Sequence, residues 1–62
     1  DAHAEDDMSG ISLREDDYAW VTRMVCDAAW DSCEGRVVSV LEGGYDLGSL
    51  ARSVVAHLRV FV

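Results

Sequence analysis

Apolar and polar positions divide the chain into segments with different periods. Residues 1–10 are polar and acidic and show no period, which is typical of a loop. Between residues 13 and 32 apolar side chains recur at spacings of three and four, which predicts a helix. Ser12 is the expected N-cap of this helix, and Gly35 is the expected stop signal. The apolar face consists of Tyr18, Val21, Val25, Ala28 and Ala29.

The next segment, residues 37–41, is apolar at nearly every position and rich in valine. This pattern predicts a strand that is covered on both faces, as in a parallel sheet. Gly43 and Gly44 follow, and glycines allow the backbone to turn sharply. Tyr45 is therefore expected just beyond the carboxyl end of a strand, where open α/β sheets place their ligand sites.

A second helix is expected after Asp46, which can cap it. Its apolar stripe consists of Leu47, Leu50, Ala51, Val54, Leu58 and Phe61. The order of helix, strand, turn and helix predicts an α/β fold with a mostly parallel sheet. If a strand ended just before Asp1, the βαβ connection would bring Asp1 and Tyr45 to the same edge of that sheet.

The length of the chain limits what it can build alone. Sixty-two residues bury little surface, and a covered strand needs neighbours on both edges. We therefore expect residues 1–62 to be an incomplete part of a larger α/β domain, which needs the remainder of that domain as its partner.

The charge of the chain limits which partners it is expected to bind, and its cysteine content indicates a cellular location. The chain has 5 basic and 12 acidic residues, a formal net charge of −7, which argues against nucleic-acid binding. No apolar run approaches the roughly 20 residues of a membrane span. In one helix, Cys26 and Cys33 would be separated by ~10 Å of rise, beyond the ~7 Å limit for a disulfide. Reduced cysteines favour an intracellular location, with cytoplasm and nucleus both open.

Several motifs of the chain match a known family. They are Asp1-Ala2-His3, Asp6 and Met8, Asp17 to Arg23, Gly35 to Asp46, Leu50 to Ser53, and His57. These motifs resemble the carboxyl-terminal part of zinc-dependent histone deacetylases and of the related acetylpolyamine amidohydrolases. The similarity is closest to the class II branch and runs over essentially all 62 residues. Its specific part is the Leu-Glu-Gly-Gly-Tyr-Asp segment.

The resemblance implies a fold, a cofactor and two functional residues. The fold would be the three-layer, arginase-like α/β domain of this family, and the cofactor would be Zn²⁺. Asp1 would be one zinc ligand, and Tyr45 would be the catalytic phenol that polarises the acyl carbonyl. Gly43 and Gly44 would shape the turn that directs the phenol.

The same resemblance implies the reaction. The enzyme would hydrolyse the acetyl amide of an acetylated lysine, in a histone or another protein, or that of an acetylpolyamine. The family's other two zinc ligands and its paired histidines lie upstream of this segment. We therefore expect the 62 residues alone to be inactive.

Two other interpretations stay open. The chain could belong to a non-catalytic binding or scaffold module of the same fold, or it could be an independent interaction peptide with two amphipathic helices. Simple structural roles are predicted for the remaining polar residues. His3 is expected to support the site from its loop, His57 to lie on a helix surface, and residues 5–7 to form a solvated acidic loop.

Overall fold

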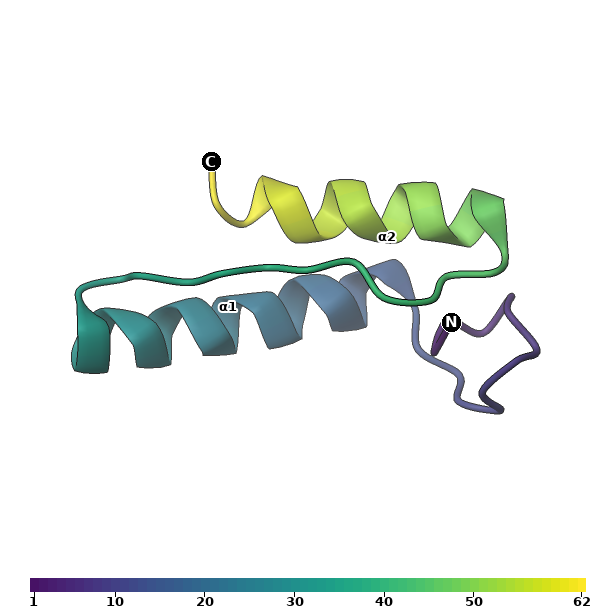
Figure 1. Cartoon of the computed structure of the whole chain (residues 1–62), viewed down its shortest axis with the longest axis horizontal. Coiled ribbons are helices and arrows are strands. Elements are labelled where there is room, and N and C mark those ends of the chain that lie inside the picture. The colour runs from purple at the N-terminus through teal and green to yellow at the C-terminus, as the bar shows by residue number, and fades with distance from the viewer.

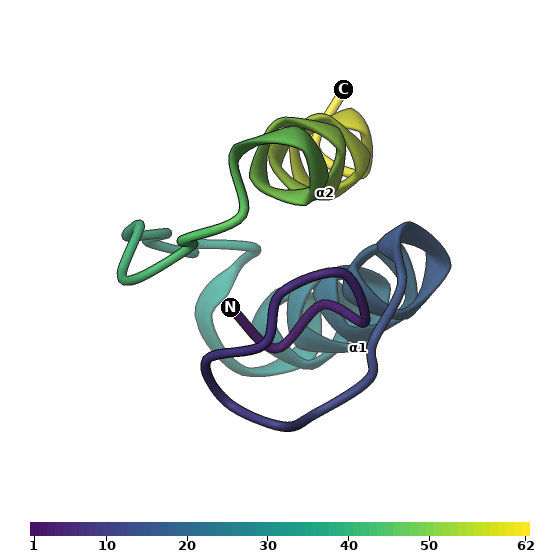
Figure 2. The same ribbon diagram turned by 90° about the vertical axis from the view of Figure 1, so that its right-hand side faces the viewer.

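The computed structural model describes all of residues 1–62 and contains two helices. Helix α1 spans Glu15–Cys33 and helix α2 spans Leu47–Arg59. The two helices lie side by side and run in the same direction, because the segment between them carries the chain back along their length (Figure 1). Figure 2 shows this segment to one side of both helices, with the N-terminal loop at the end where they begin.

The start of α1 lies three residues beyond Ser12, so the N-cap prediction for Ser12 is wrong. The reason is the pairing of Leu13 with residues 2–4: Leu13 N–H donates to one loop carbonyl at 2.9 Å, and the carbonyl of Leu13 accepts a loop N–H at 2.6 Å. These bonds hold Leu13 in an extended conformation. The N–H of Arg14 then donates to the carboxylate of Asp17 at 2.9 Å, which caps the helix instead.

The end of α1 agrees with the predicted stop signal. Glu34 and Gly35 both have left-handed backbone conformations, with φ of 62° and 79°. The N–H of Gly35 donates to a carbonyl in the last turn of α1 at 3.0 Å. Cys26 and Cys33 are free thiols, as their spacing predicts.

Residues 37–41 do not form a strand in this structure, so the helix–strand–helix order is not confirmed. The segment is extended and runs alongside the helices (Figure 1). Its apolar side chains are exposed, with Val38 90% and Val40 83% accessible. A strand is defined by hydrogen bonds to a neighbour, and the one β-bridge in the chain joins His3 to Leu13. No other segment of the 62 residues supplies the edge that this run needs.

Helix α2 begins after Asp46, as predicted, because the Asp46 carboxylate accepts the N–H of Ser49 at 3.0 Å. The buried side chains of α2 are small and polar, Ser49 and Ser53. The apolar stripe of the helix is at most half-buried, and the chain has no buried hydrophobic side chain at all. Neither helix is both long and apolar enough to cross a membrane.

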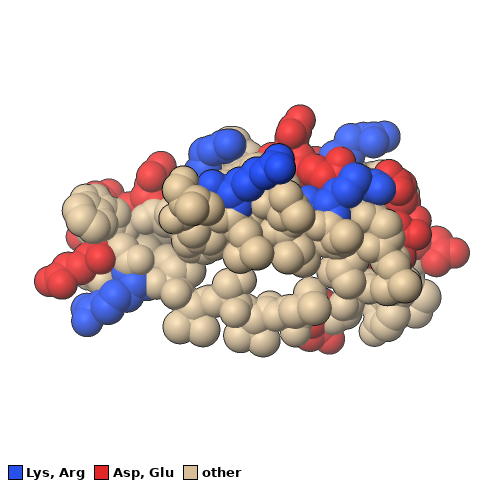
Figure 3. Space-filling model, turned by 90° about the horizontal axis from the view of Figure 1, so that it is seen from above, with Lys and Arg blue, Asp and Glu red and all other residues tan.

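Leu50, Val54 and Leu58 of the α2 stripe line a cavity of about 430 Å³ between this helix, residues 39–42 and the N-terminal loop. Figure 3 shows an opening through the molecule between a row of uncharged atoms and the body of the helices. These apolar side chains line an open space rather than a packed interior, and polar contacts such as the hydrogen bond between Thr22 and His57 help to join the two helices.

Candidate functional site

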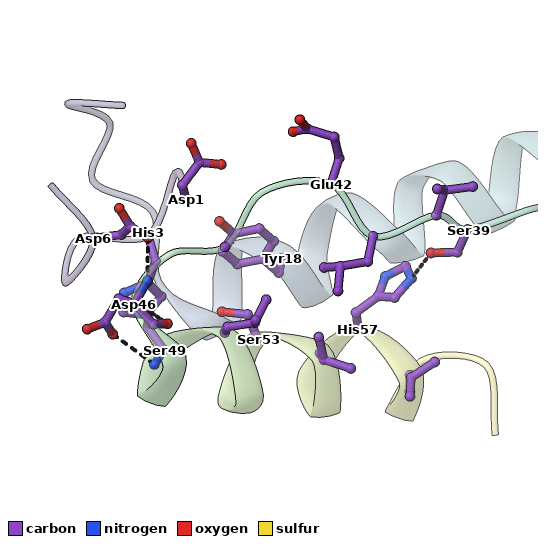
Figure 4. Close-up of a pocket in the computed structure, with 16 residues that line it drawn as sticks. Asp1, His3, Asp6, Tyr18, Ser39, Glu42, Asp46, Ser49, Ser53 and His57 are labelled. Carbon is purple, nitrogen blue, oxygen red and sulfur yellow. Dashed lines mark hydrogen bonds between the residues drawn. The ribbon is translucent and has the colours of Figure 1, made fainter. Parts of the chain in front are cut away.

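The N-terminal loop and the double-glycine turn meet at the end of the molecule where both helices begin. Asp1 lies against Gly43: a Cβ atom added to Gly43 would be 2.6 Å from Oδ1 of Asp1. Figure 4 shows Asp1 and Asp6, from the loop, near the segment that leads into α2. The chain therefore brings its first residue to a turn more than forty positions away.

Both glycines of the turn have backbone conformations that other residues rarely adopt. Gly43 has a φ of 70° and Gly44 a φ of 90°. A Cβ atom on Gly44 would approach Cδ1 of Leu50 to 2.5 Å. The turn thus needs glycine twice, once for the close approach of Asp1 and once for the packing of α2.

Tyr45 follows this turn with its side chain 62% exposed, and it does not line the 430 Å³ cavity that Asp1 lines. Its backbone, in contrast, is fixed, because the N–H of Tyr45 donates to Oδ2 of Asp6 at 2.9 Å. The structure brings the loop of Asp1 and the turn of Tyr45 together, while the chemical roles of the two side chains stay predictions.

The prediction that residues 5–7 form a solvated acidic loop is wrong for Asp6, which is buried. Only 5% of Asp6 is exposed, and its carboxylate accepts three backbone N–H groups. The N–H of Met8 lowers the pKa of Asp6 most, with smaller contributions from Asp46 and Tyr45, while burial opposes the shift. Two of these donors lie about forty residues away, so no local pattern could have identified them.

His3 is nearly fully buried, at 2% exposure, and it holds the loop to α1. Nδ1 accepts the N–H of Glu5 at 3.0 Å, and Nε2 contacts the carboxylate of Glu15. Because Nδ1 is an acceptor, the ring carries its proton on Nε2 and donates it to Glu15. This bond is the main cause that lowers the pKa of Glu15.

The side chains of His3, Glu5 and Glu15 are the one group in the chain close enough to hold a metal ion, with ligand atoms within 4.8 Å of one another. Arg52 already supplies positive charge there: Nη2 lies 2.5 Å from Glu5 and Nε lies 3.6 Å from Glu15. The group is therefore better described as an ion-pair network. Asp1 is not part of it.

His57 also departs from its prediction as a simple helix-surface residue. It is half-buried and is hydrogen-bonded on both ring nitrogens, to Thr22 of α1 at 2.8 Å and to Ser39 at 2.7 Å. Figure 4 shows the bond to Ser39. Only its position on the polar side of α2, in line with Ser49 and Ser53, hinted at this role.

Comparison with known proteins gives a consistent result. The family model of the histone deacetylase domain matches residues 1–61. The chain is 42% identical over its whole length to Type-2 histone deacetylase 2 and 43% identical over 94% of its length to Type-2 histone deacetylase 1, both from Dictyostelium discoideum. It is 37% identical over its whole length to Histone deacetylase 10, chloroplastic, from Oryza sativa subsp. japonica. The chain spans 4% of each Dictyostelium protein and 14% of the rice protein.

Proposed function

This chain belongs to the histone deacetylase family, and we propose that the full-length protein carrying it hydrolyses the acetyl amide of acetylated lysine side chains, with acetylpolyamines as the alternative substrate class. Membership implies an α/β, arginase-like fold. In the whole domain, residues 37–41 would pair as a strand with segments from outside these 62 residues. The exposure of Val38 and Val40 supports this placement.

The observation that carries the proposal is the approach of Asp1 to Gly43. It brings the predicted zinc ligand to the turn that ends in Tyr45, two residues further on. A metal-assisted hydrolysis needs both at one place, because the bound metal and the phenol would act on the same acyl group, the metal by activating water and the phenol by a hydrogen bond to the acyl oxygen.

Asp1 fits zinc as one donor. A carboxylate oxygen is an accepted zinc ligand, and the missing side chain of Gly43 leaves room beside it. When bound, zinc would polarise the acyl oxygen and make water a stronger nucleophile at neutral pH. A single carboxylate does not hold a catalytic zinc ion, so we expect these 62 residues alone to be inactive.

Tyr45 would act on the acyl oxygen of the substrate. As water adds to the carbonyl carbon, negative charge develops on this oxygen, and the phenol O–H donates a hydrogen bond that strengthens with the charge. Loss of one such donor typically costs about 3–4 kcal/mol of transition-state stabilisation. The exposed position of the Tyr45 side chain leaves the phenol free to meet a substrate.

The test compares wild type with Tyr45→Phe in the full-length protein, using an acetyl-lysine peptide and, in parallel, an acetylpolyamine. We expect kcat to fall roughly 100- to 1000-fold while KM changes little. Zinc content and thermal unfolding serve as controls, and both should match wild type. Equal rates for the two proteins would remove Tyr45 from the mechanism. A wild-type protein inactive on both substrates would favour the non-catalytic module.

A further inference from the structure

The carboxylate of Asp6 joins the N-terminal loop to the tyrosine turn. Oδ2 accepts two consecutive backbone N–H groups, from Tyr45 at 2.9 Å and from Asp46 at 2.7 Å. Oδ1 accepts the N–H of Met8 at 2.9 Å, within its own loop. One side chain therefore fixes two segments that are about forty residues apart and that carry Asp1 and Tyr45.

No cationic side chain pairs with Asp6. Arg52 bonds to Glu5 and Glu15 instead. The negative charge of Asp6, 5% exposed, is thus balanced by peptide N–H dipoles. Such a site is selective for the backbone conformation that aims these dipoles at the carboxylate, whereas a long cationic side chain would tolerate other conformations.

The tyrosine turn needs an external anchor of this kind. Gly43 and Gly44 have left-handed conformations, and glycine loses more conformational freedom on ordering than any other residue. Nothing in the local sequence holds Tyr45 in one place after two such residues. The bond from the Tyr45 N–H fixes the backbone from which the phenol extends, and the bond from Asp46 fixes the start of α2.

We propose that Asp6 is a positioning residue for Tyr45. By binding the backbone of the tyrosine turn, Asp6 fixes the position of the phenol relative to Asp1. This inference rests on the proposed function for its catalytic consequence and on the structure alone for the clamp itself. Asp6 contacts no reacting group, so its effect on the reaction passes through Tyr45.

The kinetic test uses the full-length protein and an acetyl-lysine peptide. In Asp6→Ala we expect kcat to fall about 10- to 100-fold with little change in KM, since small misplacements of a catalytic group have effects of this size. Asp6→Asn keeps one acceptor oxygen and should lie between Asp6→Ala and wild type. The matched control is Asp7→Asn, the same change at an exposed neighbour without side-chain hydrogen bonds, which should remain within about threefold of wild type.

The route through Tyr45 is tested by repeating Asp6→Ala in a Tyr45→Phe background. If Asp6 acts through the phenol, its removal there should lower kcat less than threefold, because the group that it positions is already gone. A loss of the same factor in both backgrounds would overturn the proposal, as would an Asp6→Ala protein with wild-type kcat.

Amide hydrogen exchange tests the clamp without any reference to activity. We expect the peptide containing Tyr45 and Asp46 to exchange at least tenfold faster in Asp6→Ala than in wild type, and at the wild-type rate in Asp7→Asn. Unchanged exchange in Asp6→Ala would overturn the clamp. Failure of the proposed function would look different: Tyr45→Phe would keep full activity, while the exchange effect of Asp6→Ala would remain.

Discussion

The hydroxyl of Thr22 on α1 and the ring of His57 on α2 lie 2.8 Å apart, in a hydrogen bond that joins the two helices. Thr22 uses its own hydrogen to donate to the carbonyl of Tyr18 at 2.6 Å, so Nδ1 of His57 must be the donor. Nε2 of the same ring is hydrogen-bonded to the hydroxyl of Ser39 at 2.7 Å. One imidazole thus connects both helices and the segment between them.

Replacement of Thr22 by valine tests this connection. The change keeps the shape of the side chain but leaves the N–H of His57 without an acceptor, and an unpaired buried donor costs about 1–3 kcal/mol. We expect Thr22→Val to lower the free energy of unfolding of the full-length protein's domain by roughly 1–2 kcal/mol, measured by urea denaturation.

The matched control for this prediction is Ser53→Ala. Ser53 also has a buried hydroxyl, but its oxygen has no hydrogen-bond partner. Removing an unsatisfied buried group should leave stability unchanged or raise it slightly. If both variants destabilised the protein equally, the loss of a buried hydroxyl in general, and not of the His57 bond, would explain the effect of Thr22→Val.

Gly43→Ala tests the contact that supports the proposed function. The added Cβ would lie 2.6 Å from the carboxylate of Asp1, so the flexible acid must move, and with it the predicted zinc ligand. We expect bound zinc to fall and kcat/KM to drop at least about tenfold. Both are measured on the full-length protein, by metal analysis and by deacetylation of an acetyl-lysine peptide.

Gly10→Ala separates this clash from backbone strain. Gly10 has a φ of 74°, close to the 70° of Gly43, but nothing lies within 4 Å of its Cβ position. The substitution should cost about 1–2 kcal/mol of stability from the left-handed conformation and leave zinc content unchanged. Equal loss of zinc in the two variants would remove the special role of the Asp1–Gly43 contact.

The sequence was sufficient to predict the elements whose causes are local. The period of α1, the stop at Gly35 and the cap by Asp46 all depend on neighbours within a few residues, and the structure confirms them. Ser12 failed as a cap because Leu13 pairs with the distant loop. Asp6 was misread for the same reason, since its partners lie about forty residues away.

The strand prediction for residues 37–41 stays unconfirmed for a different reason. A valine-rich composition indicates that a segment suits a covered strand, but a segment becomes a strand only when it is hydrogen-bonded to neighbouring strands. These 62 residues contain no such neighbour for residues 37–41. The sequence motifs were sufficient to predict the parts of the candidate site that lie within them. Asp1 and the glycine turn are in contact in the structure. Asp6, which joins the two segments by hydrogen bonds, could be identified only from the structure.

The acid stability of the protein should depend on Asp6. Hydrogen bonds lower the pKa of Asp6 in the folded protein below its ordinary value of 3.8, so the unfolded chain takes up a proton first as the pH falls. The stabilisation is therefore complete above about pH 5 and is lost as the pH falls below about 4. Between about pH 4 and 2, the free energy of unfolding should decline less steeply in Asp6→Asn than in wild type or Asp7→Asn. Parallel curves for all three proteins would contradict this prediction.

The isolated 62-residue chain should not unfold cooperatively. It buries no hydrophobic side chain, and large apolar residues such as Trp30, Val38 and Leu47 are exposed, so little apolar burial offsets the entropy of ordering the backbone. We expect circular dichroism to show a shallow, non-cooperative loss of helix on heating, or aggregation through the exposed segment at residues 37–41. Adding the remainder of the domain, in one chain, should restore a sharp transition, because neighbouring strands would cover that segment. A sharp transition of the isolated chain at low concentration would instead identify it as an independent folding unit and favour the interaction-peptide interpretation.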